Sequence, residues 1–176
     1  MQEIVLSDNV KPALEWVNNR VLQKVSPRRR HALAQGRFWG ALDAWACLRV
    51  SGMAGTEWHF QIQPSGEIAR TLVPDVAYLS YARLPREGLE ATEIPRVAPD
   101  VVVEVRSPED LQADIDEKLR VYFGAGTGVI FLVDPNKKTV IAIDHACQTH
   151  FDATDVVRHS SLPGFELPAR NLFELP

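Results

Sequence analysis

A glutamate and a lysine that stand where apolar residues are expected are the side chains best placed to do chemistry. Glu104 lies in PDVVVEV, a β-branched run that predicts a buried strand. Lys118 lies in EDLQADIDEKLRVYF, which predicts a helix; wound at about 100° per residue, the segment puts Lys118 in the same sector as its apolar residues. A buried charge is costly unless it is paired. We therefore expect Glu104 and Lys118 to lie close together, and a metal ion in the same site would lower the cost further.

A second carboxylate for such a site could come from either of two Pro-Asp pairs, which end at Asp75 and Asp100. Four residues of extended strand span about 13 Å, whereas two carboxylates that share one Mg²⁺ must each bring an oxygen to about 2.0–2.1 Å from it. Asp100 is therefore too far along the same strand from Glu104. Asp75 begins a different predicted strand, and sheet pairing could bring it alongside, so we expect Asp75 to be the partner of Glu104.

At these residues the chain resembles the Uma-type family of restriction-endonuclease-like proteins, a branch of the PD-(D/E)XK nuclease superfamily. The similarity runs through EWVNNRVLQKVSPRRRH, VPDVAYLS, PDVVVEVRSPEDLQADIDEKLRVYFGAGTGVIFLVDP and LPGFELPARNLF, and so covers nearly the whole chain. It implies an α/β fold, a mixed β-sheet flanked by helices, with Mg²⁺ or Mn²⁺ held at the sheet. By the same resemblance, Asp75 matches the aspartate of the PD motif, Glu104 its second acidic residue, and Lys118 a lysine that the family supplies from the next helix.

The function expected from these residues and this resemblance is a metal-dependent endonuclease that hydrolyses phosphodiester bonds in DNA. Asp75, Glu104 and the carbonyl of Val105 would bind the ion, and Lys118 would orient the attacking water or neutralise charge on phosphorus. Arg106 occupies the standard lysine position two residues after the glutamate, but arginine does not readily give up a proton, so its expected role is to orient a phosphate or to pair with Glu104. The alternative is a nucleic-acid- or protein-binding module that keeps the nuclease fold without turnover.

Two further residues are candidates for lining the site. His31 agrees with a histidine that recurs in the resembling family, and it falls on the buried stripe of its predicted helix. Glu15 matches an acidic position in the family's opening hairpin, although the Gly-Glu that is usual near that turn is Asn19–Arg20 in this chain. A hydrogen-bonded structural role is the alternative for His31.

Each main assignment also has a purely structural alternative. Asp75 could cap a turn after its proline, and Glu104 could be a core carboxylate neutralised by Arg106. Lys118 could pair only with Asp114, which stands four residues earlier in the favourable acid-then-base order.

The elements that must position these residues can be predicted from spacing and from turn residues. LEWVNNRVLQKV predicts an N-terminal hairpin that turns at Asn18–Asn19. Ser26 and Pro27 predict the start of a long helix, whose buried face would contain Ala34, Phe38, Ala41, Leu42, Trp45 and Leu48. TLVPDVAYLS reads as a strand. PDVVVEV, a helix capped by Ser107, VIFLVD and TVIAID predict a strand–helix–strand–strand order.

Length and composition bound the remaining expectations. The chain has 176 residues, 45% of them hydrophobic, which predicts one domain over residues 1–176. It contains no apolar run of membrane-spanning length and no recognisable secretion signal, so we expect a cytoplasmic protein without membrane contact. Its two cysteines are isolated in sequence, which predicts buried free thiols.

Charge bears on the nucleic-acid partner. A net charge of −4 argues against non-specific coating of nucleic acid but not against local contact. Arg28, Arg29 and Arg30 form the only dense basic run, which predicts either phosphate contacts or a solvated helical turn. Four tryptophans and an acidic surface also leave room for a homodimer, whose two active centres would serve two strands.

Overall fold

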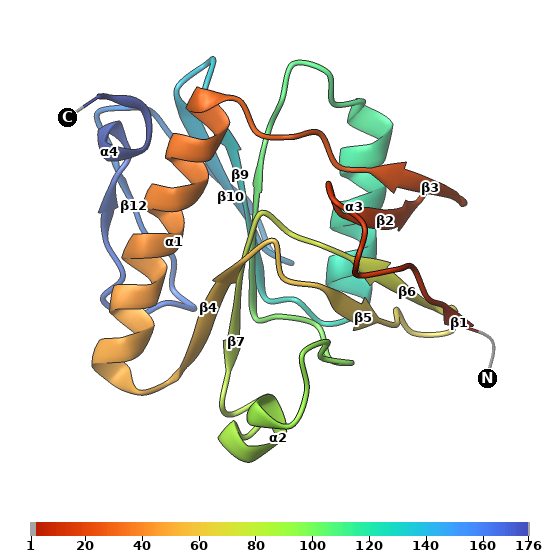
Figure 1. Cartoon of the computed structure of the whole chain (residues 1–176). Coiled ribbons are helices and arrows are strands. Elements are labelled where there is room, and N and C mark those ends of the chain that lie inside the picture. The colour runs from red at the N-terminus through yellow and green to blue at the C-terminus, as the bar shows by residue number, and fades with distance from the viewer. Residues whose placement is uncertain (1–2, 176) are drawn as a thin grey trace.

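A mixed six-stranded β-sheet forms the centre of the molecule (Figure 1). The structure, a computed structural model, describes residues 3–175. The strands are β4 (Gly52–Thr56), β7 (Val76–Ser80), β8 (Val101–Val105), β9 (Val129–Asp134), β10 (Thr139–Ile143) and β11 (Gln148–Phe151). Their order is β11-β10-β9-β8-β7-β4; β8 and β9 are parallel, and the other neighbours are antiparallel.

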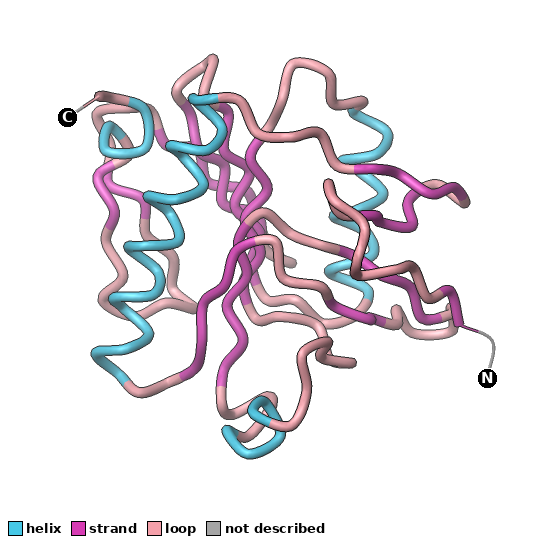
Figure 2. Tube along the Cα trace, in the orientation of Figure 1, coloured by secondary structure: helices cyan, strands magenta, loops and turns pink. Residues whose placement is uncertain are grey.

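Helices cover both faces of this sheet, so its central strands are apolar on both sides (Figures 1 and 2). Helices α1 (Arg29–Arg49) and α4 (Arg170–Phe173) pack on one face, and α3 (Gln112–Gly124) packs on the other. Side chains alternate along β8: Val101 and Val103 join the core beneath α1, while Val102 joins the core beneath α3. By the same alternation, Glu104 faces α3.

Smaller elements surround the central sheet, and several of them lie on its α3 side. The hairpin β2 (Leu14–Val17) and β3 (Arg20–Gln23) lies beside α3 (Figure 1). A three-stranded sheet has the order β1-β6-β5, formed by β1 (Glu3–Ile4), β5 (Phe60–Ile62) and β6 (Ala69–Leu72). The remaining elements are α2 (Arg86–Glu90), β12 (Val156–Val157) and β13 (Leu167–Pro168). None of the helices described is long and apolar enough to cross a bilayer.

The hairpin and the strand–helix–strand–strand order predicted from the sequence are confirmed. Asn18 and Asn19 have φ values of 50° and 58°, the left-handed conformation that a two-residue hairpin turn of type I′ requires. Strand β8, helix α3 and strands β9 and β10 follow one another in the predicted order. The predicted fold class, a mixed sheet flanked by helices with an N-terminal hairpin, is therefore the one observed.

Both predicted helix starts are wrong. Helix α1 begins at Arg29, with Arg28 rather than Ser26 at the N-cap. Helix α3 begins at Gln112, and Ser107 belongs to a separate turn in which its backbone N–H donates to Asp110. At Ser107 the reason is that residues with capping chemistry also stabilise turns, and that alternative prevails there.

Three further expectations are corrected by the structure. TLVPDVAYLS is not one strand but the end of β6 and the whole of β7, because the proline between them fixes φ and supplies no N–H for a ladder. Leu48, predicted to be buried, is 83% exposed in the last turn of α1. Cys47 and Cys147 are exposed rather than buried.

Two glycines provide a test of this packing. A Cβ at Gly52 would overlap the carbonyl oxygen of Leu79 and the Cα of Ser80 on the paired strand, whereas a Cβ at Gly36, on the exposed side of α1, would meet no atom within 4 Å. We expect Gly52→Ala to destabilise the fold by about 1–3 kcal/mol and Gly36→Ala to stabilise it by about 0.5–1 kcal/mol. Urea unfolding of both variants measures the difference, and equal midpoints would contradict the β4–β7 register.

Candidate active site

Strand pairing brings Asp75 and Glu104 together. Val76 pairs with Val103 in the antiparallel β7–β8 ladder, so the register extended by one residue places Asp75 opposite Glu104. Asp75 Oδ2 accepts a hydrogen bond of 2.7 Å from the backbone N–H of Val105, which continues the ladder through a side chain. Asp75 is only 2% exposed. Its contact with the strand that carries Glu104 is therefore built into the sheet.

Lys118 reaches the same place from α3. The buried residues of this helix recur at helical spacing and are Asp114, Ile115, Lys118, Val121 and Tyr122. The Lys118 ammonium donates to Glu104 Oε2 at 2.7 Å and to Glu15 Oε2 at 3.2 Å, and Lys118 is 9% exposed. The hydroxyl of Tyr122 donates to the other oxygen of Glu104 at 3.2 Å. Lys118 thus points into the interior and meets Glu104, as its position on the helix predicts.

The local pairings considered as structural alternatives are replaced by other partners. Asp114 accepts from Arg20 at 2.6 Å and from Asn18 at 2.8 Å, so it joins the hairpin to α3 rather than neutralising Lys118. Arg106 lines the pocket but donates to Gln112 at 3.0 Å. The partners of Glu104 are instead Lys118 and Tyr122.

Glu15 enters the site from the hairpin and is almost fully buried. Its Oε1 accepts from the backbone N–H of Val73 at 2.8 Å, and its Oε2 accepts from Lys118. Glu15 is 1% exposed. The hairpin therefore supplies a buried carboxylate that is bound to both α3 and the segment before Asp75.

Lys24 is the site residue that sequence reasoning missed. Its ammonium donates to Asp75 Oδ1 at 2.6 Å and to the carbonyl of Val73 at 2.9 Å, and it lies 3.4 Å from Glu57 Oε1. The signal that could have identified it is the two-residue period of the hairpin, in which Leu22 pairs with Glu15 and Lys24 follows on the same face.

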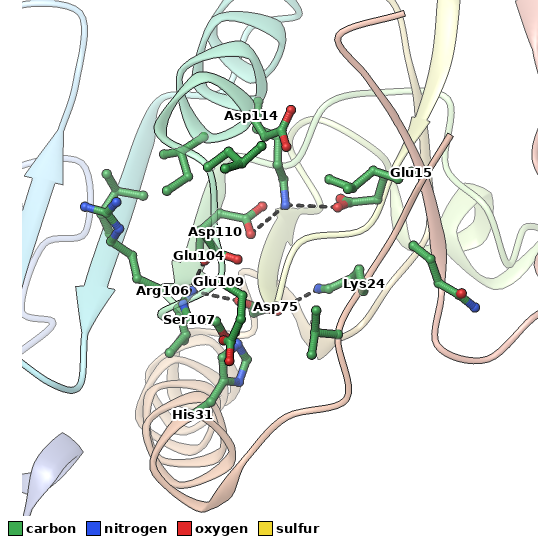
Figure 3. Close-up of a pocket in the computed structure, with 18 of the residues that line it drawn as sticks. Glu15, Lys24, His31, Asp75, Glu104, Arg106, Ser107, Glu109, Asp110 and Asp114 are labelled. Atoms are coloured by element: carbon green, nitrogen blue, oxygen red, sulfur yellow. Dashed lines mark hydrogen bonds and ion pairs between the residues drawn. The ribbon is translucent and has the colours of Figure 1, made fainter. Parts of the chain in front are cut away.

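His31 lies at the Asp75 side of the pocket. Its Nε2 is 3.3 Å from Asp75 Oδ2, and its Nδ1 is buried without a hydrogen-bond partner in the described structure. It stands in the first turn of α1 and lines the pocket (Figure 3). The histidine therefore contacts a site carboxylate rather than the apolar core.

A cavity of about 300 Å³ contains these groups, with Glu15, Lys24, Asp75 and Glu104 facing it in Figure 3. Lys118, His31, Val105 and Arg106 also line it. A second cavity of about 300 Å³ shares His31 and Arg106 with the first and is lined by Arg28, Arg29 and Arg30. Arg28 pairs with Glu109 at 2.7 Å and Arg30 donates to Asn136 at 3.0 Å. The basic run thus lies at the rim of the acidic pocket.

The carboxylates of the pocket differ in their acidity because their surroundings differ. Burial, together with the negative charges of Asp75 and Glu15, raises the pKa of Glu104 to about 7, although Lys118 opposes the shift. Burial alone would raise the pKa of Asp75 too, but Lys24 and His31 outweigh it and lower that pKa below its usual value. Of these two carboxylates, Glu104 is therefore the one that titrates near neutral pH.

Both lysines remain charged. Burial acts to lower the pKa of Lys118, but Glu104 and Glu15 outweigh it, and the pKa is raised above its ordinary value. The pKa of Lys24 is raised in the same way, against the effect of burial, chiefly by Asp75. The pocket thus contains two ammonium groups among its carboxylates.

The residues of the pocket fit a small divalent cation. The charged lining of the pocket consists of the carboxylates of Glu15, Asp75, Glu104, Glu109, Asp110 and Asp114 and the cationic side chains of Arg20, Lys24, Arg106 and Lys118. Six carboxylates against four cations leave a formal charge of −2. Among residues 3–175 no three His, Cys, Asp or Glu side chains form a metal cluster, but Mg²⁺ is commonly bound through only one or two carboxylates and keeps several waters. Asp75 and Glu104 match that donor set.

Comparison with known proteins identifies the fold and the family of this chain. A protein of known structure from Anabaena variabilis, described as "a putative nuclease belonging to DUF820", superposes with a TM-score of 0.80 at 24% sequence identity, over 93% of this chain and 91% of that one. The two proteins share a fold. No curated protein matches the chain. The Uma2 family model, whose description reads "Putative restriction endonuclease", matches residues 2–170, and the chain therefore belongs to the Uma2 family.

Proposed function

We propose that the chain is an endonuclease that requires Mg²⁺ or Mn²⁺ and hydrolyses phosphodiester bonds in DNA. Its family supports nuclease activity in general. The metal requirement and the phosphodiester chemistry are inferred from one observation. Asp75 and Glu104 lie opposite each other in the paired strands, and the buried ammonium of Lys118 contacts Glu104. Two carboxylates that can bind a metal ion, with an ammonium group beside them, are suited to metal-assisted phosphodiester hydrolysis.

The ion would be held by Asp75, Glu104 and the backbone carbonyl of Val105. When bound, it supplies Lewis-acid polarisation of the phosphodiester and lowers the pKa of a coordinated water. The sheet fixes the two carboxylates before any substrate arrives, because Asp75 is bonded to the backbone of Val105. A site binds a metal ion and a substrate well when its ligands are already held in position.

Lys118 acts as a hydrogen-bond donor and a positive charge, and not as a base. Its raised pKa keeps it an ammonium at neutral pH, so it can orient the attacking water or neutralise charge that builds on phosphorus. Glu15 and Glu104 hold the ammonium in the pocket through their hydrogen bonds. These two carboxylates position Lys118 whether or not they also contact substrate.

The basic rim provides a path for the DNA backbone. Arg28, Arg29 and Arg30 are exposed and line the cavity that adjoins the acidic pocket. Arg106 lines both cavities, so its guanidinium is suited to bind a phosphate next to the scissile one. Phosphate contacts of this kind position a duplex without reading its sequence.

A binding module without catalysis is the second candidate, and one observation favours it. Each carboxylate proposed as a metal ligand already has a protein cation, Lys24 for Asp75 and Lys118 for Glu104. Titration with Mn²⁺ separates the two functions. Binding that disappears in Glu104→Gln supports the enzyme, whereas no binding, together with a gain in stability on the same substitution, supports the module.

Two other expectations stay predictions. Residues 1–176 are proposed to form a single domain, and the chain is proposed to form a homodimer in which two active centres serve the two strands of a duplex. Analytical ultracentrifugation measures the second directly.

Removal of the central charges tests the proposed chemistry. We expect Asp75→Asn and Lys118→Met each to reduce Mg²⁺-dependent cleavage of duplex DNA at least about 100-fold, because each removes a charge that acts on the reacting phosphate. Gel assays of cleavage measure the loss, and circular dichroism checks that the fold is kept. Glu90→Gln removes an equivalent charge from an exposed position on α2 that lines neither cavity and should cleave normally. Full activity in either pocket variant would refute the assignment.

The raised pKa of Glu104 predicts how metal binding depends on pH. Below about pH 7 the buried carboxyl is increasingly protonated, and an ion must displace that proton to bind. Mn²⁺ affinity should therefore be highest above pH 7 and fall by up to about tenfold per unit below it. Calorimetry in buffers of different ionisation enthalpy measures both the affinity and the proton released. An affinity that is constant from about pH 6 to pH 8 would contradict the role given to Glu104.

Salt dependence tests the basic rim. Arg29→Ala and Arg30→Ala should each weaken binding to DNA of any sequence and reduce the slope of log affinity against log salt by about 0.9, the value for one lost phosphate contact. Fluorescence anisotropy with EDTA present measures binding without cleavage. Arg86→Ala, an exposed arginine on α2, serves as the control and should leave the slope unchanged. Unchanged slopes in all three variants would remove the rim from the proposal.

A further inference from the structure

Lys24 is surrounded by oxygen atoms in the manner of a bound cation. Its ammonium contacts a carboxylate oxygen of Asp75 at 2.6 Å, the carbonyl of Val73 at 2.9 Å and a carboxylate oxygen of Glu57 at 3.4 Å. Gln35 holds the Glu57 carboxylate and the backbone of Asp75 in place, because its Nε2 donates to Glu57 Oε1 at 3.1 Å and to the backbone carbonyl of Asp75 at 3.0 Å. The oxygens around Lys24 are therefore fixed by the fold rather than gathered by the lysine alone.

The oxygen of Asp75 that Lys24 contacts is also the one open to an ion. The other oxygen, Oδ2, receives the backbone N–H of Val105 at 2.7 Å and lies 3.3 Å from His31 Nε2. The backbone N–H of Val105 and the ring of His31 therefore occupy both lone pairs of Asp75 Oδ2. An ion bound by Asp75 must therefore use Oδ1 and share it with the Lys24 ammonium. Two cations on one oxygen in a buried pocket repel each other strongly, because the low dielectric weakens the screening.

We propose that Lys24 is a built-in competitor of the metal ion, and that its ammonium must leave Asp75 Oδ1 before an ion can bind there. The inference deepens the proposed function and rests on it. Lys24 would balance the charge of Asp75 until an ion arrives, and the affinity for the ion would be set by the difference between the two cations at the same oxygen. Such an arrangement lowers the affinity for the metal ion and stabilises the protein when no ion is bound.

The fold allows Lys24 to leave without disturbing its backbone. The backbone N–H of Lys24 donates to the carbonyl of Ala13 at 2.9 Å, which extends the β2–β3 ladder by one residue. The contacts with Asp75, Val73 and Glu57 are all made by the terminal ammonium, at the end of a long flexible side chain. Displacement therefore requires rotation of one side chain while the hairpin stays in place.

Lys24→Met tests the inference, because it keeps the length of the side chain and removes the charge. After removal of metal with EDTA and its dialysis, we expect the variant to bind Mn²⁺ at least about tenfold more tightly than the wild type and to melt at a lower temperature when no metal is added. Calorimetric titration measures the affinity, and thermal unfolding measures the stability. Lys24→Arg keeps a cation at the position and should bind no more tightly than the wild type.

Lys137→Met provides the matched control, because it removes one exposed lysine and leaves the pocket intact. Its Mn²⁺ affinity should equal that of the wild type, which excludes a general effect of net charge. If the wild type binds Mn²⁺ and Lys24→Met binds it equally or more weakly, the competitor role is overturned while the proposed metal site stands. If neither protein binds Mn²⁺, the competitor role and the metal dependence of the proposed function fail together.

Discussion

The mutual neutralisation of buried charges is the constraint on which the rest of this structure depends. Glu15, Asp75 and Lys118 lie within an otherwise apolar interior, and each would be costly there without a partner. Each partner comes from a different part of the chain: Lys24 from the hairpin, Glu104 from β8, and Lys118 from α3. The pocket is complete only when the hairpin and α3 are both docked on this side of the sheet.

The sequence predicted the parts of the site that depend on regular periods. The spacing of Lys118 among apolar residues placed it on the buried face of its helix, and the limited reach of a strand excluded Asp100 in favour of Asp75. Asp100 indeed has a separate role, since it accepts from the backbone N–H of Ser80 and pairs with Arg83. The period of a helix or strand depends on that element alone, and therefore it can be recognised in the sequence before the fold is known.

The parts that could not be predicted depend on contacts between elements. Lys24 belongs to no motif and directly follows an ordinary hairpin strand. Its importance comes from the approach of Val73 and Glu57, which are 49 and 33 residues away in sequence. The predicted start of α3 was wrong for a related reason, because Ser107 is a good capping residue but its backbone N–H donates to Asp110 in a separate turn. Competition among local hydrogen bonds is decided by the surrounding structure, which sequence patterns describe poorly.

The bonds between the hairpin and α3 have an architectural consequence. Asp114 accepts from both Arg20 and Asn18, and the Asn18 amide also donates to the carbonyl of Ala113. These bonds tie the turn of the hairpin to the first turn of α3, so Glu15 and Lys118 belong to one clamped unit. The connection from Arg106 to Leu111 does not set their spacing. That connection carries Arg106, Ser107, Glu109, Asp110 and Leu111 along the pocket, so a change in its length would reshape the pocket wall and leave the docking of the hairpin on α3 in place.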